Sequence, residues 1–104
     1  MKQKIKIGAY EWTIIEKSTR MGNKLGTSEY EKLKITLKKD LLPSIRKVTL
    51  IHELLHAFIS ASGKFSMNAE EEDKIVDSFA NQLVQFIQDN PEFFKNHILN
   101  DLKD

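Results

Sequence analysis

Residues 52–56 have the sequence HELLH, an H-E-x-x-H pattern inside a segment whose apolar residues recur at helical spacing. Residues four apart lie on one face of a helix, so His52 and His56 can present two imidazole nitrogens to a single metal ion. Glu53 points about 100° away from His52 and can reach a water molecule bound to that metal. The pattern therefore predicts a helix at this place and a hydrolytic metal site on it.

The boundaries of this helix can be read from the sequence. Pro43 suits the first turn of a helix and Gly63 suits its end, so we expect the helix to cover residues 43–62. Its apolar residues form one wide arc and comprise Val48, Leu50, Ile51, Leu54, Leu55, Phe58 and Ile59. A helix with so broad an apolar arc packs both on a sheet and on another helix. Its single polar stripe, which holds the three motif residues, is therefore expected to line a cleft.

Alternation of apolar and polar residues predicts strands before this helix. Residues 3–17 alternate in two runs, so we expect two strands broken near Gly8. Residues 18–29 are rich in glycine, serine and threonine and are expected to form a polar loop. Leu33, Ile35 and Leu37 alternate with polar residues and predict a third strand with one buried face.

Two further helices are expected after residue 62. Asn68, followed three residues later by Glu71, resembles a capping box and predicts a second long helix that ends near Asp89. Asn90 can cap a short third helix, which Pro91 would open and which would end near Leu102. The whole chain, residues 1–104, is expected to be one α+β domain. Its small three-stranded, mainly antiparallel sheet would pack on the central H-E-x-x-H helix.

Composition limits the chemistry of the site. The 104 residues include no cysteine, so any zinc must be held by His, Asp, Glu or water. The absence of cysteine suits a reducing cytoplasm, residues 1–6 do not read as a signal peptide, and no run approaches the ~18 apolar residues of a membrane span. We expect a cytoplasmic protein without a membrane partner.

Charge is unevenly distributed along the chain. Residues 1–50 hold 12 basic and 5 acidic residues, and residues 51–104 hold 4 and 10, although the net charge is only +1. Lysines that alternate with apolar residues are typical of the solvent face and edges of a sheet. No recognisable nucleic-acid-binding motif accompanies the basic half, so a nucleic-acid partner is not expected.

A zinc hydrolase site needs a third protein ligand in addition to two histidines. The remaining histidine, His97, lies far downstream, whereas acidic residues 70–73 and Asp77 begin the second helix. An antiparallel helix pair would bring these acids beside the histidines. A carboxylate that faces the core is costly unless it is paired or bound to metal, which makes Asp73 and Glu72 the leading candidates.

The segment from the residue 34–37 strand through the 49–57 helix to Phe79-Ala80 resembles small phage-associated metallopeptidases related to the ImmA/IrrE-like group of zincins. The resemblance implies a zincin-like fold, a Zn²⁺ cofactor and a protein or peptide substrate. In that family an acidic residue six positions before a Phe-Ala-like pair is the third ligand, which corresponds to Asp73 here. The family usually has Glu at this position, so Glu72 remains an alternative, as do Asp77 and a site completed by water. With Asp73 as the ligand, Asp77 would orient a ligand histidine.

These observations favour a zinc metallopeptidase in which His52, His56 and Asp73 bind the metal. Glu53 would be the general base that accepts a proton from the metal-activated water. The strand around residues 33–37 is expected to hold an extended peptide by strand addition. The alternative is a zinc-binding regulatory or interaction module of phage or mobile-element origin with little or no peptidase activity.

Overall fold

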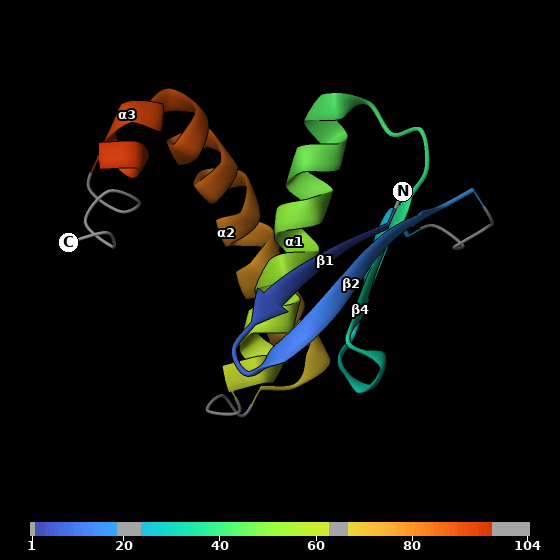
Figure 1. The fold of residues 1–104 in the computed structure, drawn as a ribbon. Helices are drawn as coiled ribbons and strands as arrows, with labels where there is room; N and C mark the ends of the chain where they lie inside the picture. The colour runs from blue at the N-terminus through green and yellow to red at the C-terminus, as the bar shows by residue number, and fades with distance from the viewer. Residues whose placement is uncertain (1, 19–23, 63–66, 97–104) are drawn as a thin grey trace.

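The computed structural model describes residues 2–18, 24–62 and 67–96, which together form an α+β fold (Figure 1). Helix α1 lies between the sheet, which it contacts on one side, and helix α2, which it contacts on the other (Figure 1). No helix in the described ranges combines the length and the apolar character needed to cross a bilayer. The predicted α+β class is thus confirmed.

The sheet is mixed, with strand order β1-β2-β4-β3. Strands β1 (Lys2–Ile7) and β2 (Tyr10–Lys17) form an antiparallel hairpin. Its turn contains Gly8 with φ +61°, a conformation that glycine adopts without steric cost. Strand β4 (Lys34–Lys38) runs parallel to β2 and antiparallel to β3 (Gly26–Glu29).

The predicted number of strands was wrong, because the described residues contain four strands rather than three. The additional strand, β3, lies within residues 18–29, which were expected to be a loop; residues 19–23 lie outside the described ranges. A 3₁₀ turn, η1 (Tyr30–Lys32), links β3 to β4. The parallel β2–β4 pairing also makes the sheet mixed rather than mainly antiparallel.

Helix α1 (Pro43–Ser62) has the predicted boundaries and covers the apolar face of the sheet. The core beneath it contains fully buried Trp12, Ile35 and Leu37, against which Ala57 of the helix packs. Ala57 lies one turn after Glu53, so the side of α1 that faces the sheet carries part of the motif. Burial of the apolar face of the sheet beneath α1 fixes the orientation of the helix.

Helix α2 (Ala69–Asp89) returns antiparallel to α1, and the side chain of Asn68 accepts a hydrogen bond from the Glu71 backbone N–H at 2.8 Å. This cap confirms the predicted start of the helix. Helix α3 (Pro91–Phe94) begins with proline at its first turn, as predicted. Its predicted end near Leu102 and the position of His97 lie outside the described residues.

Candidate metal centre and cleft

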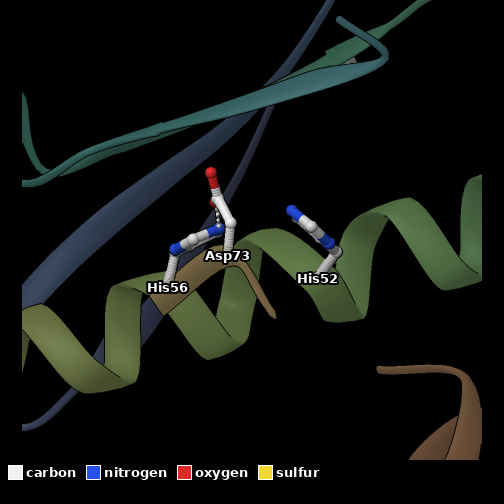
Figure 2. Close-up of side chains that lie close together, drawn as sticks. All are labelled: His52, His56 and Asp73. Atoms are coloured by element: carbon white, nitrogen blue, oxygen red, sulfur yellow. Dashed lines mark ion pairs between the residues drawn. The ribbon is translucent and has the colours of Figure 1, made fainter. Parts of the chain in front are cut away.

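His52 and His56 project from the same side of α1, with ring centroids 4.9 Å apart. Both side chains are largely but not fully buried. Figure 2 shows the two rings extending from α1 toward the side on which the strands lie. The predicted pairing of two imidazoles on one helical face is confirmed.

Helix α2 brings Asp73 to the second histidine. Asp73 Oδ1 lies 3.1 Å from His56 Nε2 (Figure 2). One ligand atom from each of His52, His56 and Asp73 lies within 4.8 Å of the other two. Zinc bonds of about 2.0–2.2 Å place tetrahedral ligands about 3.3–3.6 Å apart, so side-chain shifts of about 1 Å are enough to close the triangle. These three residues lie close enough to bind a metal ion.

The Nδ1 atom of each histidine also contacts a carboxylate of α2. Glu72 Oε2 is within hydrogen-bonding distance of His56 Nδ1, and Asp77 Oδ1 lies 3.1 Å from His52 Nδ1. In each ring, Nε2 lies on the side of the imidazole that faces away from this Nδ1 contact. Carboxylates in this position fix the orientation and tautomer of ligand histidines in metal proteins. Glu72 therefore contacts the outer nitrogen of His56 instead of joining the three-residue group.

The reason given for choosing Asp73 from sequence was wrong. Its side chain is 62% exposed, so it does not face the core, and no burial cost requires a partner for it. Asp73 approaches His56 from the solvent-exposed margin of the cleft. Its nearness to the two histidines therefore comes from the way α2 packs against α1 and not from burial in the core.

Glu53 is the buried acid of the motif, with 6% of its surface exposed. Burial raises the pKa of Glu53 above its ordinary value of 4.5, and the charges of His56 and Lys24 oppose this increase. Its Oε2 lies 4.0 Å from His52 Nε2. A carboxylate with a raised pKa is suited to accepting a proton.

Burial also affects His52. It lowers the pKa of His52 below 6.5, and the nearby His56 lowers it further, while Asp77 and Asp73 act in the opposite direction. A lowered pKa favours the neutral imidazole near neutral pH. Only the neutral ring can donate a lone pair to a metal.

Gly26 allows β3 to approach α1 closely. A Cβ atom at this position would lie 3.0 Å from Thr49 Cγ2 and 3.1 Å from Glu53 Cγ, closer than ordinary packing allows. It would also lie 3.1 Å from the Thr36 carbonyl oxygen of β4. Glycine at position 26 thus lets the strand cover Glu53 directly.

A cleft of about 960 Å³ opens beside these groups. Residues 24–29 form one wall, the motif residues of α1 line its base, and Glu72, Asp73 and Asp77 of α2 line the other side. The prediction that the polar stripe of the helix lines a cleft is confirmed. Thr49 belongs to this polar stripe, whereas Lys24 and Gly26 were not identified from sequence, since only the fold brings residues 24–29 against α1.

The strand expected to hold a peptide is an inner strand. Strand β4 is paired with β2 on one side and with β3 on the other, so it has no free edge for strand addition. Strand β3 is the edge strand in the described part of the sheet, and it borders the cleft. The Lys38 N–H donates to the Leu25 carbonyl, which turns Leu25 and alternate residues toward β4 and leaves the backbone polar groups of Gly26 and Ser28 on the outer edge.

Comparisons of the chain with protein-family models, with curated proteins and with solved structures give no match. Function is therefore argued from the geometry of the cleft.

Proposed function

We propose that this protein is a zinc-dependent peptidase with a zincin-like catalytic arrangement. The observation that carries the proposal is the convergence of His52, His56 and Asp73 beside the buried carboxylate of Glu53. Two imidazoles and one carboxylate form a donor set that suits zinc and leaves a coordination position for water. The resemblance of the 49–57 segment to small phage-associated metallopeptidases supports the same assignment.

The residues have separate roles in this proposal. His52, His56 and Asp73 hold the ion, which when bound supplies Lewis-acid activation of water and of the substrate carbonyl. The Glu53 carboxylate accepts the proton of the attacking water and delivers it to the leaving nitrogen. Asp77 and Glu72 hold Nδ1 of His52 and of His56, and so keep Nε2 of each ring directed toward the ion.

The outer edge of β3 is the proposed docking site for an extended peptide. The backbone groups of Gly26 and Ser28 offer hydrogen bonds along this edge, next to Glu53 and the histidines. Strand addition uses backbone hydrogen bonds for affinity and side-chain pockets for selectivity. A protein or peptide segment in extended conformation is therefore the proposed substrate.

A peptide-library cleavage assay on zinc-loaded protein, with and without a chelator, tests the proposal. The expected result is cleavage that the chelator abolishes and that added zinc restores. Zinc binding at the histidines without any cleavage would instead identify a zinc-binding regulatory or interaction module. Cleavage that survives removal of all metal would contradict the assigned chemistry.

A further inference from the structure

Helix α2 carries a second apolar surface that does not face α1. Ile75, Phe79, Leu83 and Phe86 are 40%, 60%, 36% and 45% exposed. At 100° per residue these four side chains fall within an arc of about 80°, and they extend over about 16 Å of helix. We call Ile75, Phe79, Leu83 and Phe86 the α2 apolar face.

None of the four residues of the α2 apolar face lines the cleft. Val76 and Ala80, each 1% exposed, mark the seam between α2 and α1. Going around the helix, the α2 apolar face lies on one side of this seam, and Asp73 and Asp77 lie on the other. Of the three α2 acids that line the cleft, only Glu72 lies within the angular range of the α2 apolar face, one turn before Ile75, so a partner centred on Phe79, Leu83 and Phe86 would leave Asp73 and Asp77 uncovered. Four large, exposed apolar side chains on one helical face are typical of a protein-binding surface.

The charge around this face indicates the chemistry of the partner. Residues 69–96 contain seven acidic and two basic residues, a formal charge of −5. Glu71 and Asp89 flank the α2 apolar face on the side away from α1. One of the two lysines, Lys74, lies 3.6 Å from Glu70. The α2 apolar face is thus bordered by acids that a basic partner would complement.

From the shape and charge of this surface, we infer that the α2 apolar face binds an amphipathic helix of another protein whose apolar stripe is flanked by lysine or arginine. The row of apolar side chains on one helix can pack into the groove between two rows of side chains on a second helix. A second copy of this chain fits less well, since it would bring two segments of charge −5 together. The inference does not depend on the metal or on peptidase activity.

Two synthetic helical peptides about 18 residues long test the inference. Both carry leucine at i, i+4, i+7 and i+11; one has lysine at the flanking positions and the other has glutamate. By fluorescence anisotropy, the lysine peptide is expected to bind with a Kd below about 100 μM and at least about tenfold more tightly than the glutamate peptide. Raising the salt from roughly 50 to 200 mM should weaken this binding.

Matched variants locate the binding site. Phe79→Glu is expected to weaken lysine-peptide binding at least about tenfold, although it adds a favourable negative charge. Asn81→Glu, which adds the same charge at an exposed position about 160° around the helix from Phe79, should not weaken it. The double variant Glu71→Gln/Asp89→Asn should reduce the salt dependence.

Three results would overturn the inference. One is equal binding of the two peptides, or no binding of the lysine peptide at 100 μM. Another is binding that Phe79→Glu does not weaken. The third is a dimer by sedimentation that Phe79→Glu converts to a monomer, which would assign the α2 apolar face to a second copy.

Discussion

Asp77 Oδ1 lies 3.1 Å from Nδ1 of His52, which links the second helix to the first histidine of the motif. Glu72 makes the corresponding contact with His56 Nδ1. Each imidazole thus has Nδ1 held by a carboxylate, while Nε2 lies beside a further acid, Glu53 for His52 and Asp73 for His56. The candidate site is therefore built from two helices, and the H-E-x-x-H pentapeptide supplies only the part that lies on α1.

The three acids of α2 should differ in their effect on zinc affinity. Asp73→Asn removes a proposed ligand and is expected to weaken zinc binding by more than about 100-fold. Glu72→Gln and Asp77→Asn alter groups that orient the histidines and should each cost about 10–100-fold or less. Competition titration with a zinc chelator of known affinity measures all three. A larger loss of zinc affinity in Glu72→Gln than in Asp73→Asn would show that Glu72 is the ligand and that Asp73 is not.

Glu53→Gln should separate metal binding from catalysis. The substitution retains the shape of the side chain but removes its ability to accept a proton, so zinc affinity should stay within a few-fold while kcat falls by about 10²–10⁴-fold. Single-turnover peptide cleavage at saturating zinc is the measurement. Turnover at the wild-type rate would show that another group is the base.

The same variant should be more stable than the wild type when both are free of metal. Because burial raises the pKa of Glu53 in the folded state, the wild-type protein loses stability as the pH rises above 4.5 through the folded-state pKa. Glutamine does not titrate, so the difference in melting temperature should be largest near neutral pH and shrink in acid. A wild-type protein that is the more stable of the two at neutral pH would contradict the direction of this shift.

Gly26→Ala should damage the site through its effect on Glu53. The added methyl group would lie 3.1 Å from Glu53 Cγ, and crowding of this kind typically costs about 1–3 kcal/mol. We expect lower stability and at least about a tenfold loss of cleavage with zinc binding retained. Gly8→Ala is the control, since Gly8 does not line the cleft and its substitution strains a φ of +61° but brings the new Cβ within 4 Å of no neighbouring atom. If both variants lose stability but keep full activity, Gly26 does not position Glu53.

Ser28→Pro tests the docking edge of β3. Proline removes one outward backbone N–H without removing a hydrogen bond to β4, so KM should rise several-fold while zinc affinity is unchanged. Ser28→Ala loses the same hydroxyl but keeps the N–H, and it should behave as wild type. Equal KM values for the two variants would argue against strand addition at this edge.

Local signals in the sequence explain why the helices could be predicted so closely. Pro43, Asn68 and Pro91 act within one turn of where they stand, and each marks a helix start in the structure. The motif likewise depends only on a helix being present. These features require no knowledge of the rest of the fold.

The sequence-based predictions that were wrong concern features that depend on distant parts of the chain. The sequence of β3 resembles a turn, and only its pairing with β4 and the close approach at Gly26 make it a strand. The exposure of Asp73 depends on how α2 crosses α1, which periodicity does not reveal. Periodicity places Asp73 beside an apolar face, but it does not show how much of that face a neighbour covers.

The most direct test of the account is a diffraction experiment at the zinc absorption edge on crystals grown with zinc and without chelator. We predict an anomalous peak at about 2.0–2.2 Å from Nε2 of His52, Nε2 of His56 and a carboxylate oxygen of Asp73. The absence of a peak between the two imidazole rings, in crystals of the folded protein, would contradict the proposed metal centre and the peptidase function built on it.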